Sequence, residues 1–106
     1  MDVEFVYDFR LQISLPRFHT AWDELDQDRQ AQILRSWEEI RGNIPERVKE
    51  LEAVINEKQA ALTEELNFER SCHLNSEIAE LASIINDLWI WFRLNPSLTT
   101  TEKSSS

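Results

Sequence analysis

The chain has 106 residues, of which 42% are hydrophobic and 29% charged, and its formal net charge is -9. This length fits one small domain, and the hydrophobic content excludes a wholly disordered chain. Because so acidic a chain neutralises phosphates poorly, we expect no nucleic-acid binding and no binding to anionic membranes. One glycine and three prolines exclude a turn-rich β-sandwich and a Gly-rich phosphate loop.

Residues 3–15 are predicted to form one long strand. Every odd-numbered residue from Val3 to Leu15 is apolar, and of the residues between them only Val6 is apolar. This period of two is typical of a half-buried strand. A lone strand leaves its backbone groups unpaired, so we expect it to pair with the same strand of a second copy or to join another protein's sheet. A local hairpin around Asp8 is the alternative, without an Asn-Gly or Asp-Gly turn to support it.

A helical segment is predicted over residues 20–41, after Pro16 ends the strand. The polar stretch 26–30 indicates a break, at which Asp26 caps a second helical piece. Gly42 then closes the segment as a C-cap. The apolar residues at roughly helical spacing are Trp22, Leu25, Ile33, Trp37 and Ile40.

A second helical region is predicted over residues 45–94, with Asn43 as its N-cap and Pro45 in its first turn. We favour an antiparallel hairpin of 46–66 against 75–94. One long helix stays open as the alternative, because the polar stretch between the two segments fits either. One apolar face comprises Val48, Leu51, Ile55, Leu62 and Leu66. The other has coiled-coil spacing of four and three and comprises Leu74, Ile78, Leu81, Ile85, Leu88 and Phe92.

Together these elements predict a mainly helical α+β fold, with a single domain over residues 1–96. Residues 97–106 are small and polar, and we expect a disordered tail there. The unpaired strand and the aromatic last helix favour a homodimer. A monomer of this size would leave the strand edges and the apolar surface of that helix largely exposed to solvent.

A row of acidic residues and one histidine runs through the second helical region at about one-turn intervals. Carboxylate and imidazole groups on helices bind iron, manganese or zinc, but the spacing lacks the Glu-x-x-His of di-iron sites. We therefore expect a solvated charged face, with no metal, no cofactor and no catalytic residue. The weak candidate metal ligands are Glu65, Glu69, His73, Glu77 and Glu80.

The stretch from Glu77 to Glu80, followed by Asn86 and Asp87, resembles the all-α nucleotide pyrophosphohydrolases. In that family two carboxylate pairs on adjacent helices hold magnesium. Here the second pair is incomplete, because no Glu-x-x-Asp follows. The resemblance covers about ten residues, and it implies a metal-dependent all-α hydrolase as an alternative function.

The run from Leu88 to Phe92 places large apolar groups all round a helix. Such clusters mark contact surfaces, and Trp and Arg are favoured interface anchors. The alternative is that the segment 20–41 covers the outer side of this helix within one domain. The predicted interface residues are Phe9, Leu11, Ile13, Trp22, Leu88, Trp89, Trp91, Phe92 and Arg93.

The leading functional prediction is a non-catalytic cytosolic protein-protein interaction protein, such as a regulator, adaptor or assembly factor. It would act as a dimeric helical scaffold for a partner with a basic or apolar groove. A cytoplasmic location fits the single cysteine, Cys72, an N-terminus without the basic region of a signal peptide, and apolar runs too short for a membrane span. A subunit whose strand completes a partner's sheet is a further alternative.

Overall fold

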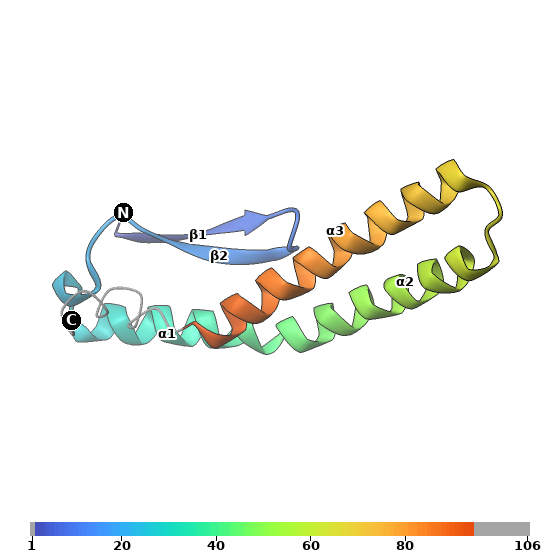
Figure 1. The fold of residues 1–106 in the computed structure, drawn as a ribbon. Helices are drawn as coiled ribbons and strands as arrows, with labels where there is room; N and C mark the ends of the chain where they lie inside the picture. Colours follow the sequence, from blue (N-terminus) through green and yellow to red (C-terminus); the bar gives the residue numbers. More distant parts are fainter. Residues whose placement is uncertain (1, 95–106) are drawn as a thin grey trace, which may run out of the picture.

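A computed structural model of the chain describes residues 2–94, which form a β-hairpin followed by a short 3-10 helix and three α-helices (Figure 1). The predicted mainly helical α+β class is confirmed. The molecule is elongated, with principal extents of 60 × 28 × 22 Å. The predicted tail, 97–106, lies outside the described residues. The elements are β1 (Val3–Asp8), β2 (Ile13–Phe18), the short 3-10 helix η1 (Trp22–Glu24), α1 (Gln27–Gly42), α2 (Ile44–Glu64) and α3 (Phe68–Arg93).

The predicted single strand over residues 3–15 is wrong, because the chain reverses at residues 9–12. β1 pairs antiparallel with β2. The backbone oxygen of Asp8 accepts a hydrogen bond from the Gln12 amide at 2.6 Å, and its Oδ1 accepts one from the Leu11 amide at 2.8 Å. Gln12 adopts a positive φ of 62°. The hairpin around Asp8 is thus formed without a glycine, and β1 finds its partner within its own chain.

The two faces of the hairpin serve different parts of the core. Because Val3 lies opposite Phe18, odd residues of β1 share a face with even residues of β2. Val3 and its neighbours pack with residues of η1 and α1, whereas Ile13 of β2 packs with α2 and α3 on the other face. The apolar residues predicted to line one side of a long strand are therefore divided between two hydrophobic clusters.

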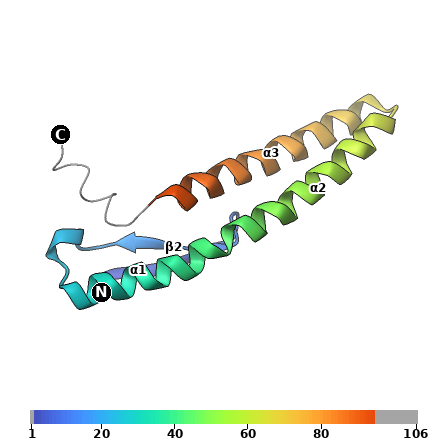
Figure 2. The same ribbon diagram turned by 90° about the horizontal axis from the view of Figure 1, so that it is seen from below.

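The predicted break within the segment 20–41 is present. η1 is a single turn, and α1 begins after Asp26, whose side chain accepts a hydrogen bond from the Arg29 amide at 2.7 Å. The predicted C-cap role of Gly42 is wrong: Gly42 has no positive φ and is the last residue of α1. Asn43 stays right-handed, with φ -89° and ψ -9°, so α1 and α2 follow one bent path (Figure 2).

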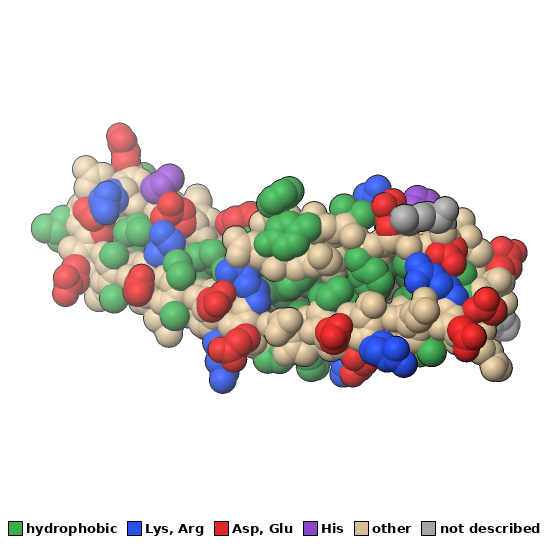
Figure 3. Space-filling model, turned by 180° about the vertical axis from the view of Figure 1, so that it is seen from behind, with side chains coloured by type: hydrophobic (Ala, Val, Ile, Leu, Met, Phe, Trp, Pro, Cys, Tyr) green, Lys and Arg blue, Asp and Glu red, His purple; other side chains and the backbone are tan. Residues whose placement is uncertain are grey.

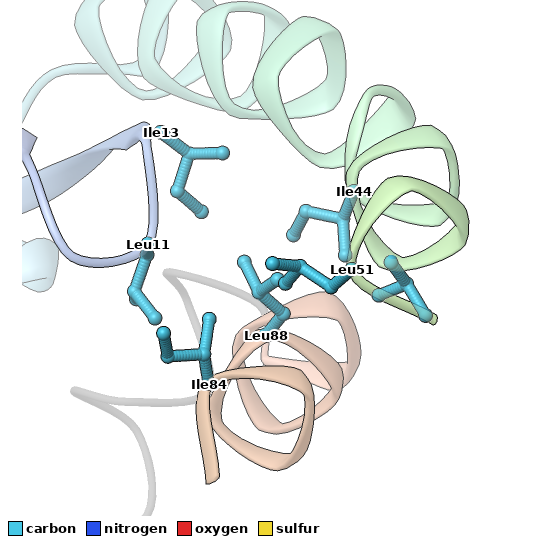
Figure 4. Packing of buried hydrophobic residues seen from close by; sticks show 7 residues of the cluster. Leu11, Ile13, Ile44, Leu51, Ile84 and Leu88 are labelled. Carbon is cyan, nitrogen blue, oxygen red and sulfur yellow. The ribbon is translucent and has the colours of Figure 1, made fainter. Parts of the chain in front are cut away.

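A proline accounts for the bend between α1 and α2. Pro45 stands in the first turn of α2, where its missing N–H removes one helical hydrogen bond. The Asn43 side chain makes no capping bond; its Nδ2 donates instead to the Glu39 carbonyl at 3.2 Å. The bend redirects α2 so that its first buried residue, Ile44, faces the end of α3 (Figure 4).

The predicted antiparallel helical hairpin is confirmed, and the single long helix is excluded. The connection comprises only residues 65–67, so α3 begins at Phe68, seven residues before the predicted position 75. Asn67 starts α3, because its side chain accepts a hydrogen bond from the Arg70 amide at 2.9 Å. No helix within residues 2–94 is long and apolar enough to cross a membrane.

The main core lies where the two long helices meet the β-hairpin turn (Figure 4). Ile44 and Leu88 have no exposed surface at all. α3 contacts both α2 and the turn, so its buried stripe is wider than a simple coiled-coil seam and includes Ile84. The buried residues of this cluster are Leu11, Ile13, Ile44, Val48, Leu51, Ile84 and Leu88.

Replacing Leu88 by alanine should lower the free energy of unfolding by about 2–5 kcal/mol, because the lost methyl groups leave a cavity in a fully buried site. Ile90→Ala on the same helix is the matched control, since Ile90 is 46% exposed and should cost much less. Chemical denaturation measures both. Equal losses for the two variants would contradict the packing described.

The positive φ of Gln12 makes a second prediction about the turn. Glycine relieves a left-handed strain of roughly 1–2 kcal/mol but adds entropy to the unfolded chain, so Gln12→Gly should raise the free energy of unfolding by up to about 1 kcal/mol. Gln12→Val should lower it, because a β-branched side chain is strained at positive φ. Thermal unfolding of the wild type and both variants in parallel measures the order of their stabilities. Equal stability of the valine and glycine variants would refute the prediction.

Candidate interaction surfaces

The row of acidic residues on α3 forms ion pairs with basic neighbours. Glu77 binds Lys58 of α2 at 3.0 Å and His73 at 3.2 Å. Glu65 lies in the α2–α3 connection and binds Arg70 at 2.9 Å. Glu69 is exposed near the start of α3. Across residues 2–94, no group of three or more His, Cys, Asp or Glu side chains is placed to hold a metal ion.

The pKa of the Glu77 carboxyl is lowered from its ordinary value of 4.5. The hydrogen bond from Lys58 is the largest cause; desolvation opposes it, and the charges of Lys58 and His73 add to it. A lowered pKa means that the pair stabilises the folded chain while Glu77 is ionised. Glu77 thus joins α2 to α3 and is not an exposed free carboxylate.

Arg10 joins the β-hairpin turn to α3, and sequence analysis did not single it out. Its Nε and Nη1 bind Glu80 at 3.1 Å and Asp87 at 2.7 Å, and its Nη2 donates to Ser83 Oγ at 2.8 Å. The hydrogen bonds that the guanidinium donates to Asp87 and then to Glu80 raise its pKa. Two of the carboxylates that resemble the pyrophosphohydrolase pattern, Glu80 and Asp87, thus fix the turn on α3.

The aromatic end of α3 is largely covered within the chain, as the intradomain alternative expects. The rings of Trp91 and Trp37 of α1 meet edge to face, with centroids 5.9 Å apart. Arg41 of α1 stacks over the Phe92 ring at 4.8 Å. The Trp37 Nε1 donates to the Leu94 carbonyl at 3.2 Å. α1 therefore provides cover that the sequence also allowed from a second subunit.

The predicted interface residues divide by burial. Four are buried in their own chain, namely Leu11, Ile13, Trp22 and Leu88. The three aromatic residues of α3 are half-buried, namely Trp89, Trp91 and Phe92. Arg93 is exposed, and Phe9 in the hairpin turn is 84% exposed. Among the predicted set, Phe9 therefore offers the largest accessible apolar surface relative to its size.

A hollow of about 340 Å³ lies between the β-hairpin and the end of α3. Trp91 forms one wall, and the strands contribute the rest. Among the described residues, its charged lining residues are Asp8 and Arg17, which lie on opposite strands.

The tip of the α2–α3 hairpin lies far from the β-hairpin (Figure 1), and it carries two exposed apolar side chains. Leu66 is 99% exposed and Phe68 is 79% exposed. The prediction that Leu66 continues the apolar face of α2 is wrong, because α2 ends at Glu64. The sequence signal was present, since Leu-Asn-Phe sets two large apolar residues inside a polar stretch.

A second exposed apolar group lies on β1 and in the turn that follows it. Val6 is 38%, Tyr7 47% and Phe9 84% exposed. The rings of Tyr7 and Phe9 pack edge to face, with centroids 5.0 Å apart. The described residues thus expose groups of large apolar side chains at the helical tip and on the hairpin, and single ones at Val54 and Ile90.

Comparisons with family models, curated proteins and solved structures found no match to the chain. Its interaction surfaces therefore rest on the geometry described above.

The Glu77–Lys58 pair predicts a pH dependence. The folded pKa of Glu77 lies below its ordinary value, so the pair stabilises at neutral pH and its contribution disappears as the pH falls through the folded pKa. Glu77→Gln should be less stable than the wild type at neutral pH, and the difference should shrink as the pH falls below the ordinary carboxyl pKa of 4.5. Glu52→Gln on the exposed side of α2 is the control. A constant difference between Glu77→Gln and the wild type over that range would contradict the ion pair.

Proposed function

We propose that the chain is a non-catalytic protein-protein interaction protein, such as a regulator, adaptor or assembly factor. In this proposal the β-hairpin and α1 anchor a helical arm, and the tip of the arm binds a partner. The observation that carries the proposal is the exposure of two large apolar side chains, Leu66 and Phe68, two positions apart in the sequence at the tip. Burying each side chain on binding would gain about 1.5–3 kcal/mol.

The charges near the tip support a partner with an apolar recess and a basic rim. Glu64 and Glu69 flank the two apolar side chains and are exposed. The whole chain carries a net charge of -9, which would attract a basic partner and speed the encounter. An apolar centre with a charged rim is the usual anatomy of a specific interface.

A dimeric form of the scaffold stays a prediction. The argument from an unpaired strand no longer holds, because β1 pairs with β2 inside the chain. The remaining ground is the apolar surface of α3, where Ile90 is 46% exposed beside the half-buried aromatic residues. Light scattering at two concentrations about tenfold apart measures the mass. A cytoplasmic location is likewise our proposal, supported by the free, exposed Cys72.

Removing the apolar tip should abolish partner binding without unfolding the chain. We expect the double variant Leu66→Ser, Phe68→Ser to bind its partner at least about tenfold more weakly, because contact residues of this size carry most of an interface's binding energy. Its free energy of unfolding should change by no more than about 0.5 kcal/mol, since both side chains are exposed. Val54→Ser, at an exposed apolar residue of α2 away from the tip, is the control.

The measurement has two stages. A photo-crosslinking residue at position 66 identifies proteins that touch the tip in cells, with position 59 on α2 as the reference. Calorimetry with the purified partner then compares wild type, tip variant and control. Recovery of the same proteins at positions 66 and 59, or equal affinity of wild type and tip variant, would refute the proposal.

A further inference from the structure

The two outer edges of the β-hairpin are not equivalent. The His19 amide donates to the Asp2 carbonyl at 2.8 Å, which marks these residues as a hydrogen-bonded pair. Such pairs alternate along an antiparallel ladder, so even residues of β1 bond to β2. The backbone groups of Val3, Phe5 and Tyr7 therefore point outward. Pro16, opposite Phe5, agrees with this alternation because it has no N–H to give to β1.

Four outward groups of β1 have no partner in the described part of the chain. Val3 is already engaged: its amide donates to Asp2 Oδ1 at 2.6 Å, and its carbonyl accepts from Arg29 Nη2 at 3.1 Å. For the amides and carbonyls of Phe5 and Tyr7, residues 2–94 supply no such bond. β1 thus presents two donors and two acceptors along its edge.

The edge of β2 is protected, and that of β1 is not. Pro16 removes the middle donor from the outer side of β2, which is one of the usual ways in which proteins block an edge. β1 contains neither proline nor lysine. An unblocked edge invites another strand, and its donors and acceptors would be satisfied by main-chain bonds to that strand.

Apolar side chains accompany the unblocked edge. Val6 and Tyr7 are exposed on opposite faces of β1, and Phe9 follows in the turn. Figure 3 shows hydrophobic side chains gathered across the middle of the surface opposite to the view of Figure 1. An added strand would therefore gain side-chain contacts on both of its faces as well as main-chain bonds.

The acidic side chains of β1 determine which kind of strand can pair with its outer edge. Glu4 and Asp8 lie on either side of Val6, on the same face of β1. A second copy of β1 fits poorly, because pairing Phe5 with Tyr7 of that copy sets Glu4 opposite its Asp8. A strand with basic residues four positions apart would instead set opposite charges against both carboxylates.

We propose that the outer edge of β1 binds an extended basic segment of a partner protein as a third strand. Lys or Arg residues of that segment face Glu4 and Asp8, and apolar residues between them pack against Phe5 and Tyr7. Four main-chain hydrogen bonds to Phe5 and Tyr7 provide the pairing, and the side chains set the specificity. This surface is separate from the helical tip, so the Leu66→Ser, Phe68→Ser variant should bind the same segment as well as wild type does.

The test uses the full chain and the synthetic peptide acetyl-Thr-Lys-Ile-Val-Ile-Lys-Thr-amide. Hydrogen exchange measured by NMR should slow at least about tenfold at the Phe5 and Tyr7 amides when peptide is added, because both become hydrogen-bonded. The Glu4 and Val6 amides are already bonded to β2 and should change much less. Replacing both peptide lysines by glutamate should weaken binding at least about tenfold.

N-methylated peptides distinguish strand pairing from non-specific hydrophobic binding. N-methylation of both isoleucines blocks the amides that would face β1 and should weaken binding at least about tenfold, whereas N-methylation of the central valine should have little effect. Tyr7→Pro removes one outward donor of β1, so it should weaken binding of the unmodified peptide, as N-methylation of the isoleucines does. Tyr7→Val, which keeps the donor, is its control. The peptide experiment stands even if Tyr7→Pro fails to fold.

Three results would overturn the proposal. The first is unchanged exchange at Phe5 and Tyr7 with the peptide at about 2 mM. The second is equal binding of the two methylated peptides. The third is protection of the same amides that grows with protein concentration in the absence of peptide, which would assign the edge to a second copy.

Discussion

The packing around Leu88 holds the rest of the structure in place. Leu88 of α3 and Ile44 of α2 are fully buried against each other's helices. The turn of the β-hairpin contributes Leu11 to the same cluster. Ile44 can reach this position because the chain bends directly before it, at Asn43. A straight continuation of α1 would carry the first turn of α2 in another direction, so the bend and the core depend on each other.

The β-hairpin depends on this helical frame. A two-stranded sheet is only marginally stable in water by itself. Here each face of the hairpin meets a different set of partners, with Val3 in the cluster around Ile33 and Ile13 in the cluster around Leu88. Arg10 adds a polar link from the turn to α3. Exposed ion pairs contribute little to stability, so the effect of Arg10 is to orient the turn more than to stabilise it.

The helical hairpin was predictable from the sequence, whereas the β-hairpin was not. The four-and-three spacing of apolar residues in α3 leaves a stripe that favours packing against a second helix. In the N-terminal segment, the alternation of apolar residues runs unbroken through the turn, so nothing in the period marks the reversal. The turn is made instead by the Asp8 side chain and a positive φ at Gln12, and neither leaves a strong sequence signal.

In the candidate sites, too, some features were predictable from the sequence and others were not. The charged row on α3 was readable as a helical face, but the neutralising partners Lys58 and Arg10 come from α2 and the hairpin turn, which only the tertiary structure brings near. Leu66 was misassigned because it lies four residues after Leu62, a spacing that holds only while the helix continues. α2 ends at Glu64, so Leu66 leaves the apolar face and becomes almost fully exposed.

The two proposed binding surfaces differ in the kind of partner they select. The helical tip offers side chains alone, so its partner must supply a shaped recess. The β1 edge offers main-chain groups, which any extended segment can match, and leaves selection to Glu4 and Asp8. The 21 residues of α2 extend over about 30 Å, so the tip and the β1 edge stand far enough apart for two partners to bind together. If both surfaces are occupied, the rigid arm fixes the distance between the partners and raises the effective concentration of each for the other. That is a task for a structural scaffold, and it requires no catalytic group.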